Sequence, residues 1–458
     1  MPEDDKIVPR GHPLPQTLEE RLTAQFYEWE RRGRGWQVLE YPVELEPPFR
    51  PFLFHYAESP PAVDDGRRPT FLSSLFESLS GASHGEKARA IQPVPAFEPE
   101  EPLPEVFAND GDLVELQVAL PPVVKTAKEA AERFLLSLKY CSRPVSFEII
   151  GTEDSIVIEL ACREQDHAQV RQQLQAHFPE SVITERPGFL DEQWDDAEPC
   201  VIVDFGLSHE FMLPLRTFRG FEVDPLVGTV GALVDLREGE VGLVQVLFQA
   251  ARYPWAESVL RAVSDWEGRA FFADAPQMLA LAKEKIAQPF FAGVIRVAAQ
   301  GHTSARAWQI VKALGGSLAQ FANPTSNELL ALSNDGYDDR HHALDLLARR
   351  SRRSGMLLNA DELVSLVHLP SASVRVPKLK REERKSKAAP AIVLGHRYIL
   401  GENSHAERTV SVSLSPDERS RHCYLIGASG TGKSTLLLNL ILQDINNGQG
   451  VAVLDPHG

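Results

Sequence analysis

The chain has 458 residues and a net charge of −17, with 43% apolar and 24% charged residues. This composition is that of an ordinary globular protein, and the length suggests two to four domains. No apolar run approaches the roughly 18–20 residues that a membrane-spanning helix needs. The N-terminus, MPEDDKIVPRGHPLP, lacks the apolar core of a signal peptide. We therefore expect a cytoplasmic protein with no transmembrane segment.

The charges are unevenly distributed along the chain. Residues 341–458 hold 16 Lys and Arg against 11 Asp and Glu, whereas residues 1–340 hold 31 against 53. Any electrostatic attraction for DNA would therefore come from the C-terminal quarter. The four cysteines form no C-x-x-C pair, which indicates neither a zinc site nor a disulfide framework and favours thiols in the core. They are Cys141, Cys162, Cys200 and Cys423.

The first two regions differ in how regular their patterns are. Residues 1–110 are expected to be a variable, partly disordered region with one short helix at 17–31, opened by a capping box of Thr17 and Glu20. Residues 111–198 are expected to follow the order β-α-β-β-α-β of a ferredoxin-like unit. The predicted strands are 112–120, 145–150, 154–160 and 182–186, and the predicted helices are 125–140 and 165–178.

Residues 199–340 are expected to form a second, related α+β unit. We predict strands at 200–207 and 289–300, a hairpin of 226–236 with 240–250, and helices at 255–263, 276–286 and 303–321. Neither unit presents a catalytic constellation. The scattered polar residues of the two units are therefore predicted to be structural. They include His167, His177, Asp204 and His209.

Residues 341–391 are expected to be a basic linker with a docking helix. The basic runs 349–355 (RRSRRSG) and 375–387 (RVPKLKREERKSK) would either contact phosphate or, as we favour, lie in a solvated linker. Between them, residues 356–370 (MLLNADELVSLVHLP) are apolar enough to dock as a helix.

The motif that carries chemistry lies in residues 422–435, HCYLIGASGTGKST. The pattern G-x-x-x-x-G-K-[ST] predicts a loop whose backbone N–H groups line an anion-binding nest at a helix N-terminus. In such a loop the lysine, Lys433, reaches the β- and γ-phosphates of ATP, and the hydroxyl of Ser434 ligates Mg²⁺. The predicted nucleotide-binding residues are Gly427, Ala428, Ser429, Gly430, Thr431, Gly432, Lys433, Ser434 and Thr435.

The flanks of the motif fit a P-loop. We predict a buried strand at 423–426, a helix at 433–447 that Gly448 ends as its C-cap, and a further strand at 451–455. The helix is apolar nearly all round, which predicts burial on more than one side, inside a large α/β domain or against another subunit. Residues 392–458 are too few for such a domain, so most of it is expected to be missing here.

Residues 427–458, GASGTGKSTLLLNLILQDINNGQGVAVLDPHG, resemble the start of the motor domain in the HerA/FtsK superfamily. They look most like the type IV secretion and conjugative coupling ATPases of the TraG/TraD kind. The stretches ADELVSLVHLP, LGENSH and VSVSL resemble that family too, so the likeness covers about residues 357–458. It implies a RecA-like domain that uses ATP and Mg²⁺, moves DNA and works as a ring of identical subunits, a hexamer.

The resemblance also bears on catalysis. It puts Asp455 near the nucleotide, with Lys433 as the other candidate catalytic residue, and it puts the Walker B acids, sensor and arginine finger beyond residue 458. Without those groups we expect weak nucleotide binding and no efficient turnover. The chain is then either the N-terminal part of a longer DNA-translocating ATPase or a natural truncation.

The expected fold class is thus α+β accessory domains followed by the start of an α/β P-loop NTPase domain. Two other functions remain open. One is a P-loop ATPase that moves or assembles protein partners, with which the acidic residues 1–340 are consistent. The other is a truncated nucleotide-binding regulatory subunit without enzymatic activity.

Overall fold

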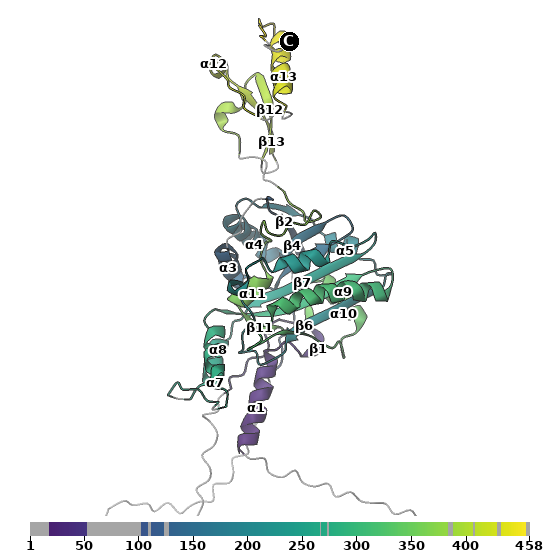
Figure 1. Cartoon of the computed structure of the whole chain (residues 1–458), viewed down its shortest axis with the longest axis vertical. Coiled ribbons are helices and arrows are strands. Elements are labelled where there is room, and N and C mark those ends of the chain that lie inside the picture. Colours follow the sequence, from purple (N-terminus) through teal and green to yellow (C-terminus); the bar gives the residue numbers. More distant parts are fainter. Residues whose placement is uncertain are drawn as a thin grey trace, which may run out of the picture. The chain divides into compact units, whose positions relative to one another are not determined.

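A computed structural model describes the chain as two compact units, which meet in the sequence between Lys380 and Arg381 (Figure 1). The residues that it describes are 18–52, 102–108, 111–122, 128–265, 267–272, 274–382, 388–405, 408–427 and 432–454. Within them, no helix combines the length and the apolar character that crossing a bilayer requires.

The larger unit is built on one sheet, in which the described residues form nine strands (Figure 1). The strand order is β5-β2-β4-β3-β7-β8-β6-β9. Strand β11 lies off this path and pairs with residues 290–293 of β8. The pairings along β2-β4-β3-β7-β8-β6-β9 are antiparallel, as is that of β11 with β8. The strands are β2 (Leu113–Ala119), β3 (Val145–Gly151), β4 (Ile156–Arg163), β5 (Val182–Glu185), β6 (Cys200–Leu207), β7 (Val241–Ala250), β8 (Phe290–Gln300), β9 (Leu329–Ala331) and β11 (Met356–Asn359).

The two halves of this sheet have the same strand order, but the second half has it in the opposite direction across the sheet. Numbered within each half, strands β2 to β5 lie in the order 4-1-3-2, and strands β6 to β9 in the order 2-3-1-4. The second strands of the two halves, β3 and β7, pair in the middle, where Val145–Gly151 lie opposite residues 242–248. The two sequence segments with similar patterns therefore form a single continuous sheet.

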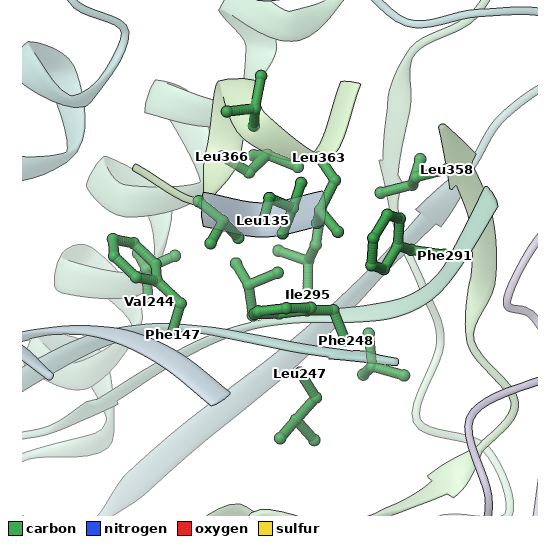
Figure 2. Close-up of a cluster of buried hydrophobic side chains, with 14 of the residues drawn as sticks. Leu135, Phe147, Val244, Leu247, Phe248, Phe291, Ile295, Leu358, Leu363 and Leu366 are labelled. Atoms are coloured by element: carbon green, nitrogen blue, oxygen red, sulfur yellow. The ribbon is translucent and has the colours of Figure 1, made fainter. Parts of the chain in front are cut away.

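The major apolar core packs eight of the described helices against the sheet, and five of them cover one of its faces. Figure 2 shows Leu135, Leu363 and Leu366 from these helices facing Val244 and Ile295 of the sheet. On β2, β3 and β4 alternate residues enter this core, as the period of two in the sequence predicts, whereas consecutive residues of β7 and β8 enter it. The five helices are α3 (Lys128–Ser137), α4 (Glu164–His177), α6 (Leu226–Ala232), α9 (Ser304–Leu318) and α11 (Ala360–Leu366).

A smaller apolar cluster covers part of the opposite face. There Leu190 of α5 (Phe189–Gln193) and Leu346 of α10 (Asp339–Leu347) pack on Ile150, Leu243 and other residues that point away from the major core. The sheet is thus buried on both faces, which explains why its strands read as nearly continuous apolar runs.

The N-terminal region contributes to the same unit. Helix α1 (Leu18–Arg32) and strand β1 (Val38–Val43) are followed by residues 44–52, and the region buries Phe26, Trp29 and Phe52 in the major core. The helix that the sequence predicts at 17–31 is confirmed over the described residues, while Thr17 of its predicted capping box lies outside them. Strand β1 pairs with β10 (Ser351–Arg353), more than 300 residues later in the chain.

The remaining short elements of the larger unit lie in its connections. Helices α7 (Trp255–Val263) and α8 (Gln277–Lys285) pack together between β7 and β8, where the sequence predicts two helices. Single turns of 3-10 helix occur at η2 (Leu138–Tyr140), η3 (Phe218–Gly220) and η4 (Ala319–Phe321).

One predicted strand of the larger unit is wrong. Residues 226–236 were expected to pair with 240–250 as a hairpin, but residues 226–232 form α6. The buried residues Leu226, Val230 and Leu233 recur every three to four positions, which is a helical spacing. Asp224 accepts a hydrogen bond from the Leu226 amide and so stabilises the start of this helix.

The basic run at 349–355 is not a solvated linker. Its arginines Arg349 and Arg353 are 3% and 2% exposed, and both pair with carboxylates of the sheet. Of residues 356–370, which were expected to dock as a helix, Ala360–Leu366 do so as α11, which a capping box of Asn359 and Glu362 opens, whereas Met356–Asn359 form strand β11. Residues 341–380 therefore fold into the larger unit.

The smaller unit combines a hairpin with two helices. Strands β12 (Tyr398–His405) and β13 (Arg408–Leu414) are antiparallel, with the turn η5 (Ala391–Val393) before them and helices α12 (Pro416–Arg419) and α13 (Lys433–Asn446) after them. The strand predicted at 423–426 is wrong, as is that at 451–455 over its described residues 451–454. A strand needs a hydrogen-bonding neighbour, and none pairs with these residues within the described chain, where Tyr424, Ile426 and Leu454 are exposed.

Candidate nucleotide-binding site

The predicted phosphate-binding loop lies in the smaller unit. The structure describes Gly427 at its start and residues 432–435 at its end, whereas the predicted site residues Ala428, Ser429, Gly430 and Thr431 lie outside the described residues. Asp455, the other candidate near the nucleotide, also lies outside them. The geometry of the site is therefore that of the two ends of the loop and of the helix that follows.

Gly432 gives the chain its sharp entry into α13. Its φ of +84° lies in the left-handed region, which a glycine adopts without a steric penalty. A Cβ at this position would meet no atom within 4 Å, so the backbone conformation rather than crowding calls for glycine. Its carbonyl accepts the first helical hydrogen bond, from the Leu436 amide at 3.0 Å.

Lys433 connects the two ends of the loop. It is the first residue of α13, and its Nζ donates a 2.6 Å hydrogen bond to the main-chain oxygen of Gly427. The ammonium group therefore lies across the segment where the pattern predicts phosphate. A cation and the N–H groups of the first helical turn meet at this place, and both favour an anion.

Ser434 and Thr435 follow on the first turn of α13 with exposed side chains. The hydroxyl oxygen of Ser434 is a hard donor of the type that Mg²⁺ prefers, so this residue could help to hold such a metal. Among the described residues, no group of three or more His, Cys, Asp and Glu side chains is arranged to hold a metal ion.

The far end of α13 is anchored by a polar cluster that the sequence did not reveal. The hydroxyl of Tyr398 donates to the main-chain oxygen of Leu440 at 2.8 Å and to Asp444 Oδ2 at 3.1 Å. Arg419 pairs with the same Asp444 and lies 3.7 Å from the centre of the Tyr398 ring. Burial and then the hydrogen bond to Asp444 raise the pKa of Tyr398.

Gln443 adds a second anchor on the same side of the helix. Its side-chain amide exchanges two hydrogen bonds with the main chain of Ile399, at 2.9 and 2.8 Å. The signal for both anchors was the short polar sequence Gln443-Asp444 within an otherwise apolar helix. The helix ends as predicted, with Gly448 at a φ of +71°.

The apolar residues of α13 are largely exposed within the described chain. Leu437, Leu438, Leu442 and Ile445 expose between 46% and 59% of their surface, and only Asp444 is buried. The described residues do not include the domain or subunit that was expected to cover this helix, so its burial on more than one side stays a prediction.

Two segments of the chain match known protein families. Residues 112–270 match a domain of unknown function (DUF8128), and residues 398–458 match the family described as Helicase HerA, central domain. The second match supports an ATPase of the HerA/FtsK type. It contains α13 and the whole predicted loop, so two independent observations indicate nucleotide chemistry here. No curated protein matches the chain.

Proposed function

We propose that residues 392–458 form the start of a RecA-like, ATP-binding motor domain that moves DNA. The observation that carries the proposal is the position of Lys433. It begins a helix after a left-handed glycine and reaches back to Gly427, inside a segment that matches the HerA central domain. This is the arrangement by which a P-loop holds the phosphates of a nucleotide.

Each residue of the loop has a role in this proposal. Backbone N–H groups between Gly427 and Ser434 bind phosphate oxygens, Lys433 exchanges its hydrogen bond with Gly427 for the β- and γ-phosphates, and Thr435 lies near the α-phosphate. Ser434 ligates Mg²⁺, which neutralises charge on the phosphates when it is bound. Asp455 lies near the nucleotide.

The remainder of the proposal concerns the setting of this domain. The protein works in the cytoplasm as a ring of identical subunits, a hexamer, on DNA, as a relative of the type IV secretion and conjugative coupling ATPases. The larger unit, as two ferredoxin-like halves, is the accessory part. The strand orders 4-1-3-2 and 2-3-1-4 support this assignment, because 4-1-3-2 is the order of a ferredoxin-like sheet.

Nucleotide binding is the first test. We would titrate the full chain with a fluorescent ATP analogue in the presence of Mg²⁺ and compare Lys433→Ala with Lys312→Ala, which removes an exposed lysine from α9. We expect Lys433→Ala to bind at least about tenfold more weakly, because a charge-assisted contact to phosphate is lost, and Lys312→Ala to bind like wild type. Equal binding by all three proteins would reject the nucleotide site.

A second measurement separates DNA from protein as the cargo. ATP hydrolysis by the protein purified from its own source would be measured with and without double-stranded DNA. Stimulation that depends on Lys433 supports the DNA motor. If no form of DNA changes the rate of ATP hydrolysis but a protein partner raises it, the alternative is favoured, which is an ATPase that moves or assembles proteins.

A further inference from the structure

A row of buried polar side chains crosses the sheet of the larger unit on the face opposite the major core. Six residues on six neighbouring strands lie directly opposite one another in register, and each is at most 7% exposed. In sheet order they are Gln117, Glu159, Glu148, Gln245, Arg296 and Asp204. Polar side chains buried in this way need partners from whatever covers them.

The cover is the segment of residues 339–353, which comprises α10 and β10 and which we call the strap. Its backbone accepts hydrogen bonds from the row: Gln245 Nε2 donates to Leu346 O at 3.0 Å, and Arg296 Nη1 donates to Arg350 O at 2.8 Å. Leu346 also packs into the smaller apolar cluster beside the row. The strap is thus held by a small apolar contact and by charges.

At one end of the row, Arg349 of the strap meets three carboxylates. Its guanidinium nitrogens lie 2.6 Å from Glu115, 3.0 Å from Glu148 and 3.3 Å from Glu159, and all four side chains are at most 3% exposed. Arg349 is also the one non-glycine residue with a positive φ, at 50°, among the described residues. A strained backbone thus delivers a single cation to three buried carboxylates.

The groups around this cluster do not balance its charge. Asp191 of α5 adds a fourth carboxylate 3.9 Å from Arg349, and Arg163 of β4 donates to the strap at Ala348 O. Neutral groups also bond to these carboxylates, namely the Gly188 amide, which donates to Glu115, and the side chains of Ser146, Gln117 and Gln245. Three carboxylates cannot all remain ionised around one cation without water.

The other end of the row has the opposite balance. Asp204 faces Arg296 at 3.2 Å, Arg353 of the strap at 2.9 Å and His342 of the strap at 3.1 Å. Although burial opposes it, His342 and the two arginines hold the pKa of Asp204 below its usual range. Asp345 of the strap is likewise paired, with Arg350 and Arg352. The Asp204 carboxylate therefore stays ionised and holds this end of the strap to the sheet.

We propose that a proton held by Glu159 or Glu115, beside Glu148, fastens the Arg349 end of the strap, and that loss of this proton loosens it. The charge count and the distances carry the proposal, because water must enter before the third carboxylate can ionise, and the strap is what excludes it. The device is independent of nucleotide binding.

The direction of the pH dependence follows from the carboxyl groups. Burial, and then the neighbouring Glu148, raises the pKa of Glu159 from its ordinary 4.5 to about 8, and burial raises that of Glu115. Because the carboxyl pKa is higher in the closed state, protonation stabilises the closed strap. This stabilisation is complete below about pH 4.5 and is lost as the pH rises to about 8. The open fraction therefore increases by up to about tenfold for each pH unit in this window and then levels off.

Hydrogen exchange of the full chain tests the strap. The amides of Ala348, Arg349 and Arg350 donate to main-chain oxygens and report its opening, with the amides of α9 as the reference. After correction for intrinsic chemistry, we expect strap opening to rise at least about tenfold from pH 5.5 to 7.5 relative to α9. In Glu159→Gln, which keeps the neutral form permanently, we expect a rise of less than about twofold.

A matched control is Glu240→Gln. Glu240 is also buried, but it is paired with a single cation, Arg306, at 2.8 Å, and this hydrogen bond lowers its pKa. This variant should keep the wild-type pH dependence. If Glu159→Gln does not fold, Glu115→Gln removes one carboxylate from the same cluster and must reduce the rise. Strap opening that does not change with pH in wild type, or that changes equally in wild type and Glu159→Gln, would overturn the proposal.

Discussion

Lys433 and Gly427, six residues apart, are joined by a 2.6 Å hydrogen bond from the lysine ammonium to the glycine carbonyl. The bond ties the two ends of the phosphate-binding loop together while α13 holds its own position against β12. Because a phosphate would attract the same ammonium group more strongly than a carbonyl does, the bond is one that nucleotide binding replaces. The loop is thus closed by the residue that the proposed function uses.

Replacing Gly432 by alanine tests whether the entry into α13 matters for binding. The left-handed φ of +84° strains any residue with a Cβ, at a penalty of about 1 kcal/mol or more, although no atom crowds the position. We expect Gly432→Ala to leave the fold intact and to weaken binding of the fluorescent ATP analogue about tenfold, because the first-turn N–H groups shift. Gly450→Ala is the control, since that position is equally open and has no positive φ. Equal affinities would show that this entry does not shape the site.

Removing the Tyr398 hydroxyl tests the anchor of α13. Tyr398→Phe deletes the bonds to Leu440 and Asp444 and leaves a buried carboxylate with one partner fewer. We expect the smaller unit to lose about 1–2 kcal/mol of stability, read as at least about tenfold faster hydrogen exchange in the last two turns of α13. Tyr424→Phe removes a hydroxyl from a residue that is 86% exposed and should change nothing. Unchanged exchange in Tyr398→Phe would mean that the Gln443 bonds and the Arg419–Asp444 ion pair hold the helix without this hydroxyl.

The parts that the sequence predicted correctly are those fixed by local pattern. Strand β6 occupies the predicted residues 200–207, and helix α9 lies within the predicted 303–321. Helix α13 also lies within its predicted residues, and Gly448 ends it as predicted. Each combines a clear period with a start or stop signal within a few residues, so no distant contact is needed to recognise it.

The parts that the sequence did not predict depend on distant partners. Arg349 bonds to Glu148 and Glu159, 201 and 190 residues earlier, so a run that reads as a basic linker is an internal ion-pair network. Tyr398 and Asp444 are 46 residues apart, and nothing near either residue indicates the other. Residues 423–426 and 451–454 were predicted as strands from their apolar pattern but do not form them. A strand needs a neighbouring strand as its hydrogen-bond partner, and the local pattern does not show whether there is one.

A fully buried ion pair in the larger unit offers a test of stability. Lys285 Nζ lies 2.6 Å from Glu362 Oε2, and both side chains are 0% exposed. Lys285→Met leaves an unpaired carboxylate in the core, so we expect a loss of about 3–5 kcal/mol in urea unfolding followed by tryptophan fluorescence.

The double variant Lys285→Met with Glu362→Gln separates charge from packing. It should recover part of the loss, because no buried charge remains. The recovery stays incomplete because Glu362 also accepts bonds from the Leu215 and Asn359 amides, and an amide has only one acceptor oxygen. A double variant that is less stable than Lys285→Met alone would show that hydrogen bonding at Glu362 outweighs its charge.

Two glycine-to-alanine substitutions in the larger unit should change the free energy of unfolding in opposite directions. At Gly355 a Cβ would lie 2.8 Å from the Gly293 amide nitrogen and 2.9 Å from the Leu45 carbonyl oxygen, and both are backbone atoms that cannot rotate away. Gly355 also donates its own N–H to Leu45 at 2.8 Å, so the chain cannot move apart without breaking this bond. We expect Gly355→Ala to lower the free energy of unfolding by about 1–3 kcal/mol.

Gly316 is the matched position, because it lies within α9 and a Cβ there would meet no atom within 4 Å. Gly316→Ala should raise the free energy of unfolding by about 0.5–1 kcal/mol, since alanine loses less backbone entropy than glycine in a helix. Both variants would be measured by urea unfolding under identical conditions. If Gly355→Ala proved as stable as wild type, the close approach of β11, β8 and residue 45 would not constrain the fold.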